Sequence, residues 1–329
     1  MPFCYILSVA SEPKTLQQAI QYFSDEEVCI QTVVKVRWAS GRPVCPACGR
    51  TDHYYLKTQK RWKCKECWKQ FSVKVGTIFE DSPLGLDKWL PAFWLLVNCK
   101  NGVSSYEVGR ALGISQKSAW FMLHRLRMVL QSGSVMKLGG TGGEIEVDES
   151  FIGGKSRNMH KDVRKRRIPK PGPTGKAVVF GVLERGKEIR THVVADRKAG
   201  TVLPIVEQHV QRGATVFTDE YAGYDSLKYE YIHEVINHME SYVHGRVHVN
   251  GMENFWSLLK RGLSGTYVNV EPFHLFRYLD EQTFRYNNRK DEQGNKLTDA
   301  QRFTLALSQV AGKRLTFKEV TGKVGETAF

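Results

Sequence analysis

The sequence predicts an α/β fold, a mixed sheet with flanking helices, preceded by a cysteine-rich domain and a helical domain. Two Cys-x2-Cys pairs lie within residues 45–67, and a segment of helical periodicity with a central glycine follows at 104–127. From residue 144 onward, the period-two alternation of strands is interrupted by segments of helical periodicity. Such a mixture indicates a sheet covered by helices.

The composition indicates a folded protein that binds a polyanion. The chain has 329 residues, 41% of them hydrophobic, and a formal net charge of +14. This excess makes nucleic acid the leading partner class, although a merely basic protein would show the same charge. No segment approaches the ~18 consecutive apolar residues that a membrane-spanning helix needs. The apolar opening MPFCYILSVA is short and lacks a basic start, so we expect no signal peptide.

Changes in composition along the chain predict several domains. The glycine-rich stretch KLGGTGGE at 137–144 marks the boundary before the α/β part. The total length also exceeds that of one average domain. We expect an N-terminal helical segment at 1–38, a cysteine-rich domain at 39–80, a helical domain at 81–136, the α/β domain at 140–290 and a polar tail at 291–329.

The four clustered cysteines have the spacing of a zinc site. Cys45 and Cys48 form one Cys-x2-Cys pair, and Cys64 and Cys67 form a second pair fifteen residues further on. Two such turns complete a tetrahedral shell of four thiolates, which leaves no open position and makes the Zn²⁺ structural. The pattern predicts a zinc ribbon. Cationic and aromatic residues are interleaved around the cysteines, and such a surface suits contact with phosphates.

Residues 104–127, SSYEVGRALGISQKSAWFMLHRLR, have the pattern of a helix-turn-helix. Ser104 and Glu107 have capping-box spacing, Gly113 supplies the turn, and Ser115 caps the second helix. An ordinary helical hairpin would show the same pattern, so the basic charge and the zinc ribbon favour the DNA-binding alternative. The second helix would present three side chains to a DNA groove: Gln116, Lys117 and Trp120.

Strand and helix patterns alternate after residue 144. The strand segments, rich in β-branched and aromatic residues, are EIEVDESF, AVVFGVLE, IRTHVVADR and ATVFTDE. TVLPIVEQHVQRG, between the third and fourth strands, has helical periodicity, as do NGMENFWSLLKRG and EPFHLFRYLDEQTFRYNNR after them. Three strands, a helix and a further strand predict a mixed sheet.

Three acidic residues stand where a strand or a helix can deliver them to a common site. Asp148 lies on the alternating strand EIEVDES, and Asp219 ends the apolar run ATVFTD. Glu253 lies on an amphipathic helix away from its apolar stripe, with Lys260 almost two full turns further on. Any one of these acids alone would be read as a surface charge. Together they can hold two divalent cations roughly 4 Å apart for phosphoryl chemistry.

The donor set indicates which cations and supporting groups to expect. Carboxylate oxygens favour Mg²⁺ or Mn²⁺, which leave positions free for substrate phosphates. Lys260 would contact a DNA phosphate as a point charge. The other acids of the first strand, Glu144, Glu146 and Glu149, are expected to face solvent or to support the site.

The order of these motifs resembles that of a known family. RWASGRPVCPACG, RWKCKECWKQFSVKVGTIFEDSPL, EVDESFIGGK, FTDEYAGY, HVNGMENFWSLLKRGLSGTY and FRYNNR follow one another over roughly residues 35–290. The chain resembles bacterial insertion-sequence transposases of the DDE type with an N-terminal zinc ribbon, a group related to eukaryotic Merlin elements. The resemblance implies a ribonuclease-H-like fold and Mg²⁺-dependent cleavage and joining of DNA.

The resemblance also implies roles for single residues. Asp148 and Asp219 match the two catalytic aspartates, and Lys260 matches the lysine after the third acid. The family varies between Asn and Glu at the third position, and HVNGME contains both Asn250 and Glu253. We choose Glu253 because it is charged and lies seven residues before Lys260. Asp148 would then bridge both cations, while Asp219 binds one and Glu253 the other.

A basic segment follows the first predicted strand of the α/β domain. Residues 155–176, KSRNMHKDVRKRRIPKPGPTGK, carry nine Lys or Arg against one Asp, and their Pro and Gly residues predict a loop. A solvated loop and a DNA contact are both compatible with this composition. The densest cluster, which would grip DNA, is Arg164, Lys165, Arg166 and Arg167.

The sequence as a whole predicts a DNA transposase. The zinc ribbon and the helix-turn-helix would bind the element's terminal repeats, and the α/β domain would perform Mg²⁺-dependent strand cleavage and strand transfer. Two element ends have to be held together, so we expect at least a homodimer, working on the bacterial nucleoid in the cytoplasm. A catalytically silent DNA-binding regulator and a stand-alone metal nuclease are the competing readings.

Overall fold

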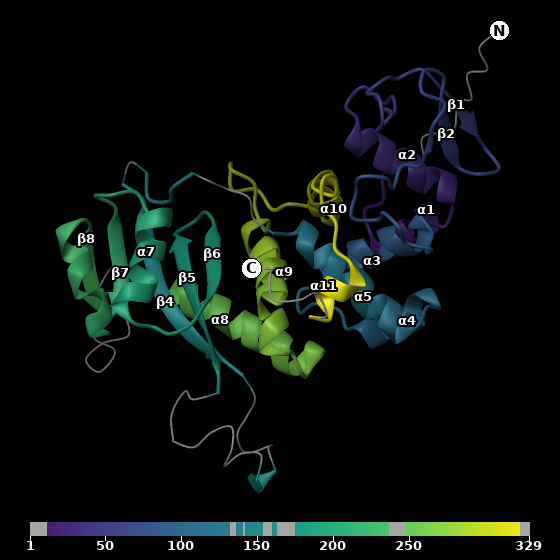
Figure 1. Cartoon of the computed structure of the whole chain (residues 1–329). Coiled ribbons are helices and arrows are strands. Elements are labelled where there is room, and N and C mark those ends of the chain that lie inside the picture. Colours follow the sequence, from purple (N-terminus) through teal and green to yellow (C-terminus); the bar gives the residue numbers. More distant parts are fainter. Residues whose placement is uncertain are drawn as a thin grey trace. The chain divides into compact units, whose positions relative to one another are not determined.

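The protein is built from two compact units (Figure 1). The structure, a computed structural model, describes residues 12–131, 136–140, 142–153, 160–162, 175–236 and 248–322. Unit 1 combines Met1–Leu130 with Lys296–Phe329, and unit 2 is Gln131–Asn295. Unit 2 is therefore an insertion between two segments of unit 1.

Unit 1 consists of a small antiparallel sheet and a set of helices. The sheet has the strand order β1-β2-β3 and forms part of the predicted zinc ribbon. The elements of this unit are α1 (Leu16–Tyr22), α2 (Glu26–Arg37), β1 (His53–Leu56), β2 (Arg61–Cys64), β3 (Gln70–Phe71), α3 (Leu86–Asn98), α4 (Ser105–Leu112), α5 (Gln116–Val129), α10 (Asp299–Ser308) and α11 (Phe317–Val320).

Helices α4 and α5 form the predicted helix-turn-helix. Ser104 and Glu107 make a capping box at the start of α4, and the side chain of Ser115 accepts a backbone N–H at the start of α5. Gly113 ends α4 with a φ of 65°, the left-handed conformation that glycine adopts most easily. A Cβ at Gly109 would lie 3.1 Å from the carbonyl oxygen of Ile114, so the glycine permits the close contact at the turn. The two helices, their caps and the glycine turn thus lie at the residues that the sequence predicted.

The segment after residue 296 packs into unit 1. Arg302 Nε donates to Asn98 Oδ1 at 3.0 Å, and Asn98 Nδ2 donates to the carbonyl oxygen of Asp299 at 3.2 Å. The ring of Phe303 on α10 lies 5.3 Å from that of Trp94 on α3. The expected polar tail thus contains a helix that completes the core of this unit.

Unit 2 is built on a five-stranded mixed sheet. The strand order is β6-β5-β4-β7-β8; β4 pairs antiparallel with β5 and parallel with β7. All four predicted strands are present, and β8 is an additional parallel edge strand. The regular elements within the described residues of this unit are β4 (Glu144–Ile152), β5 (Ala177–Glu184), β6 (Ile189–Val194), α7 (Ala199–His209), β7 (Thr215–Asp219), η2 (Ala222–Tyr229), β8 (Ile232–Ile236), α8 (Asn250–Gly262), η3 (Leu263–Tyr267), η4 (Pro272–His274) and α9 (Leu275–Asn287).

Helices cover both faces of this sheet (Figure 1). On one face, Ile145 and Val147 of β4 pack against Val202 and Val206 of α7 in one buried cluster. On the other face, side chains of β5 share a second buried cluster with α8 and α9. Since side chains alternate along a strand, Glu146 and Asp148 of β4 point to the α8 face. The predicted α/β fold with a mixed sheet and flanking helices is confirmed.

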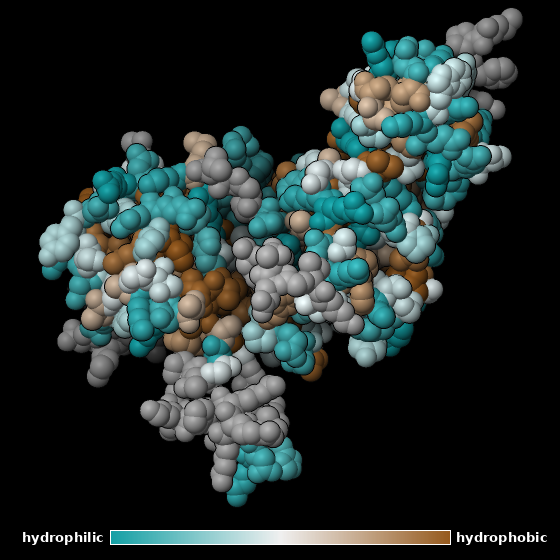
Figure 2. Space-filling view, in the orientation of Figure 1, coloured by the Kyte–Doolittle hydropathy of each residue, from teal (hydrophilic) through white to brown (hydrophobic). Residues whose placement is uncertain are grey.

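Hydrophilic residues predominate on the face shown in Figure 2, with hydrophobic residues scattered among them. Within the ranges that the structure describes, no helix is both long and apolar enough to span a membrane.

Candidate metal and DNA-binding sites

The four predicted zinc ligands come together in unit 1. The Sγ atoms of Cys45, Cys48, Cys64 and Cys67 all lie within 4.8 Å of one another. Two of these separations are 3.6 Å, for Cys45 and Cys67, and 3.5 Å, for Cys48 and Cys64. Thiolates held about 2.3 Å from a tetrahedral zinc ion stand about 3.8 Å apart, so the donors fit Zn²⁺. The arrangement suggests a structural zinc, as the spacing predicted.

Asp148 lies on the central strand of unit 2 and faces helix α8. Its Oδ2 accepts a hydrogen bond from the indole Nε1 of Trp256 at 2.9 Å, and its Oδ1 accepts the backbone N–H of Glu149 at 2.8 Å. Burial, helped by the nearby charges of Glu149 and Asp219, raises the pKa of Asp148 to about 7. A carboxyl in this setting favours a proton or a cation as its partner.

Gly181 makes room for the contact between Trp256 and Asp148. It pairs with Asp148 across the antiparallel strands β4 and β5. A Cβ at this position would lie 2.3 Å from Met252 Cε and 3.0 Å from Trp256 Cζ2. Only glycine therefore lets α8 approach the sheet closely enough for the indole to reach the carboxylate.

Substitution of this glycine by alanine is the first test of the arrangement. Gly181→Ala should lower the free energy of unfolding by about 1–3 kcal/mol, because the added methyl overpacks the contact with α8. Gly200→Ala in helix α7 is the matched control. No atom lies within 4 Å of the added Cβ, so the free energy of unfolding should rise slightly. Urea unfolding of the three proteins measures both effects. Equal stability of Gly181→Ala and wild type would contradict the close approach.

Asp219 ends strand β7 beside Asp148. Glu146 of β4 is in register with Phe217 of parallel β7, so two residues further along each strand Asp148 and Asp219 occupy neighbouring positions on the α8 face. Asp219 Oδ1 accepts the backbone N–H of Tyr221 at 3.2 Å. Two carboxyls on adjacent strands, facing the same side of the sheet, are a donor set that suits Mg²⁺ or Mn²⁺.

Glu253 and Lys260 lie on α8 and are exposed. Glu253 precedes Trp256, which contacts Asp148, by three residues, that is, by less than one turn of the helix. Asn250, also exposed, is the first residue of α8. Among the described residues, the four cysteines are the only group of three or more potential ligands within 4.8 Å of one another. Asp148 and Asp219 thus lie on one face of the sheet, and α8, which carries Glu253, covers that face without the three acids closing into a cluster.

Glu146 anchors the helix that carries Glu253. Its side chain is 1% exposed, so of the two expected roles Glu146 has the supporting one and does not face solvent. One carboxylate oxygen accepts the backbone N–H of Met252 at 2.9 Å, and the other accepts Arg185 Nε at 2.7 Å. A Cβ at Gly251 would lie 2.7 Å from this carboxylate. A negative charge at the N-terminus of a helix is stabilising, so Glu146 fixes the start of α8 on the sheet.

Glu149 supports the site from the opposite face of the sheet. Its side chain is 4% exposed, which again excludes the solvent-facing alternative. Oε2 accepts the hydroxyl of Tyr224 at 2.5 Å, and Arg197 lies 3.5 Å from Oε1. Burial raises the pKa of Glu149. Because Tyr224 follows Asp219 closely in the chain, Glu149 holds the segment that leaves β7.

The residues predicted to read DNA stand at the start of α5. Gln116 Nε2 donates to Ser105 Oγ at 2.8 Å, which ties it to α4. Lys117 is exposed, with Nζ 4.9 Å from the ring centroid of Phe317. Trp120 is half-buried against His124. The basic cluster Arg164, Lys165, Arg166 and Arg167 lies outside the described residues.

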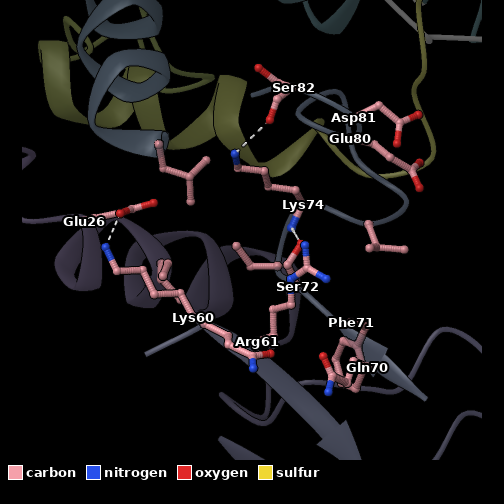
Figure 3. A pocket seen from close by; sticks show the side chains of 15 residues that line it. Glu26, Lys60, Arg61, Gln70, Phe71, Ser72, Lys74, Glu80, Asp81 and Ser82 are labelled. Atoms are coloured by element: carbon pink, nitrogen blue, oxygen red, sulfur yellow. Dashed lines mark hydrogen bonds and ion pairs between the residues drawn. The ribbon is translucent and has the colours of Figure 1, made fainter. Parts of the chain in front are cut away.

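A polar pocket of about 360 Å³ lies in unit 1 beside the zinc ribbon (Figure 3). Lys74 Nζ donates to the carbonyl oxygens of Ser82 at 3.2 Å and Leu84 at 2.6 Å, and Lys60 pairs with Glu26. Two of the three cationic side chains that line the pocket, Lys60 and Lys74, thus have partners within the protein, and Arg61 is the third.

The sheet order and the placement of the acids define a class. A five-stranded mixed sheet, with an aspartate on its central strand and a second one on the adjacent parallel strand, is the architecture of a ribonuclease-H-like domain of the DDE type. The zinc ribbon in unit 1 precedes this domain in the chain.

Comparisons with known proteins agree with this class. Residues 140–287 match the family model of the ISXO2-like transposase domain, and residues 24–70 match that of the transposase zinc-ribbon domain. The chain therefore belongs to the ISXO2-like transposases with an N-terminal zinc ribbon. It is 33% identical over 102 residues to an uncharacterized transposase-like protein of Haemophilus influenzae, across 31% of this chain and 82% of that protein. It is 27% identical over 259 residues to an uncharacterized protein in transposable element ISH50 of Halobacterium salinarum, across 74% and 85% of the two chains.

Proposed function

We propose that this protein binds the terminal repeats of an insertion sequence and catalyses Mg²⁺-dependent DNA strand cleavage and strand transfer. The position of Asp148 supports the proposal most: its buried carboxyl faces α8, with Asp219 at the neighbouring position of the parallel strand. Carboxylates gathered there would repel one another and a DNA phosphate in the absence of a cation. Such a site suits chemistry in which cations and phosphate meet.

Different residues of unit 2 would bind the cations, orient Asp148 and contact the DNA phosphate. Asp148, Asp219 and Glu253 would hold Mg²⁺ or Mn²⁺, with Asn250 as the alternative to Glu253. Two such cations, when bound, activate the attacking oxygen and neutralise charge on the phosphate. Trp256 holds the carboxyl of Asp148 in one orientation. Lys260, exposed two turns beyond Glu253, would pair with a phosphate of the bound strand.

DNA recognition would fall to unit 1 and to the basic segment of unit 2. The zinc ribbon and the start of α5 would contact the terminal repeats, and the cationic cluster at 164–167 would contribute phosphate contacts. Two ends must be joined, so the active form would be a homodimer or larger, at work on DNA in the cytoplasm. We also propose that the protein is bacterial and related to Merlin elements. The relatives do not decide its origin, because the one in Halobacterium salinarum is archaeal.

The direct test is incubation of the purified protein with Mg²⁺ and DNA that carries the terminal repeats flanking its coding sequence. We expect nicked and then joined products, both lost when Mg²⁺ is omitted. DNA binding without either product would identify a catalytically silent regulator. Nicks without joined products would identify a metal nuclease.

A further inference from the structure

The two zinc-binding turns of the ribbon have the same backbone geometry but differ in one residue. In the first turn, the N–H of Cys45 donates to the carbonyl oxygen five residues later at 2.8 Å, and in the second, the N–H of Cys64 does the same at 3.0 Å. The residue after each second cysteine has a positive φ, 73° at Gly49 and 60° at Trp68. A tryptophan thus stands where the turn favours glycine.

This tryptophan is not explained by burial. A side chain in the left-handed conformation costs free energy that glycine avoids. Trp68 is 64% exposed, so its ring regains little of that cost by packing. Lys63 Nζ lies 5.1 Å from the centroid of the indole. A strained backbone that presents a large exposed ring next to a cation indicates a role in binding.

A second exposed ring, that of Tyr54, lies on strand β1 of the small sheet beside this turn. Tyr54 is directly opposite Lys63 in the pairing of β1 with β2, so the two point to one face. Tyr54 is 53% exposed, and Lys65 Nζ lies 4.9 Å from its ring centroid while also pairing with Asp52 at 2.7 Å. Each of the two exposed rings therefore has its own lysine.

The other aromatic residues of the ribbon point the opposite way. Trp62 is 5% exposed, and its ring lies within 6.5 Å of four neighbours. The interleaved aromatics in the sequence thus separate into a buried or half-buried set, which packs together in the ribbon's core, and an exposed pair. The buried set comprises Trp62 with His53, Tyr55 and Phe71.

We propose that Trp68 and Tyr54 stack on unpaired bases of a DNA strand, while Lys63 and Lys65 contact its phosphates. Exposed aromatic rings next to cations on an open sheet face are the features that bind single strands, because every base has a face on which a ring can stack. Bases inside a duplex are already stacked on one another and offer no such face. The inference rests on the proposed function, since it takes DNA as the partner.

The test compares two DNA forms and uses the geometry of the turn itself. Trp68→Gly restores the residue found at the equivalent position of the first turn, so zinc content and thermal stability should be retained or raised. Binding of a labelled oligothymidylate of about 15 nucleotides should weaken roughly tenfold, the loss of about one stacked base. Binding of a duplex of the same length should be unchanged. Trp68→Phe, which keeps a ring, should fall between wild type and Trp68→Gly.

The control is Tyr229→Ala in unit 2. Tyr229 is 80% exposed with Lys228 Nζ 5.4 Å from its ring, so it matches the ribbon's rings in exposure and cationic neighbour. This variant should bind both DNA forms as wild type does. Equal losses on single strand and duplex, or no loss at all in Trp68→Gly, would overturn the proposal. The assay omits divalent cations and scores no cleavage, so its outcome is independent of the test of strand cleavage.

Discussion

Replacing Asp148 by asparagine is expected to abolish DNA cleavage and, in the same protein, to raise stability in the absence of divalent cations. The amide is neutral and binds Mg²⁺ poorly, so we expect cleavage to fall by about 10³-fold or more. The amide oxygen can still accept the hydrogen bond from Trp256, but the amide nitrogen then faces the backbone N–H of Glu149, so this one local hydrogen bond is lost. Loss of activity would therefore come with an intact fold.

The gain in stability follows from the raised pKa of Asp148. Burial, with help from Glu149 and Asp219, moves it from 3.8 to about 7. Between these values the folded protein binds the proton that the unfolded chain has released, so stability falls as the pH rises through this window. At about pH 8 the buried carboxylate costs the metal-free wild type about 1–3 kcal/mol, which the asparagine avoids.

Thermal unfolding at about pH 5 and about pH 8, with and without Mg²⁺, measures this effect. The advantage of Asp148→Asn should grow with pH, and Mg²⁺ should stabilise the wild type more than the variant. Asp225→Asn, an exposed aspartate of η2, is the control and should leave cleavage and stability unchanged. A difference in stability between variant and wild type that does not change with pH would contradict the raised pKa of Asp148.

The second large effect is expected at the third acidic position. Glu253→Gln keeps the size of the side chain but removes its charge, so cation binding should weaken and cleavage should fall by about 10²-fold or more. DNA binding should survive or tighten, because one source of repulsion against phosphate is gone. Asn250→Ala should be much milder, since a neutral amide contributes less to holding a cation. Nicking assays and DNA titrations on both variants show which substitution lowers cleavage more and whether DNA binding is retained.

A conservative variant separates direct ligation from a general charge effect. Glu253→Asp shortens the side chain, and partial recovery of cleavage in Mn²⁺, which tolerates imperfect geometry better than Mg²⁺, would support a direct bond to the cation. The opposite ranking, an active Glu253→Gln and an inactive Asn250→Ala, would move the third position to Asn250. Glu253 would then be a supporting residue on the same helix.

Local patterns in the sequence were sufficient for most of the fold. Alternation identified the strands that carry Asp148 and Asp219, and the caps of the helix-turn-helix were found at the predicted residues. Strand β8 was missed because it is an edge strand: Ile232 and Val235 are 57% and 48% exposed, so its apolar residues do not mark a buried face. Helix α10 was missed because its partners on α3 lie far earlier in the chain.

The candidate site was less predictable than the fold. A carboxylate on an alternating strand is normally solvated, and nothing near Glu146 in the sequence reveals that Arg185 and the backbone of α8 will bury it. The same holds for Glu149, whose partner Tyr224 comes from another element. The role of Gly181 could not be predicted from the sequence either, because it depends on how closely helix α8, much later in the chain, approaches this residue. Contacts between residues distant in sequence account for each omission.

The insertion of unit 2 into unit 1 has a consequence for biosynthesis. Helix α3 leaves the ribosome early, yet α10, which packs on it, emerges only after the whole of unit 2, Gln131–Asn295, has been made. At roughly 5–20 residues per second, this delay is on the order of ten to thirty seconds. Unit 2 can fold on the nascent chain during that time, while α3 still exposes the apolar surface that Phe303 will cover. The half-built N-terminal unit would then be the species that chaperones bind during translation.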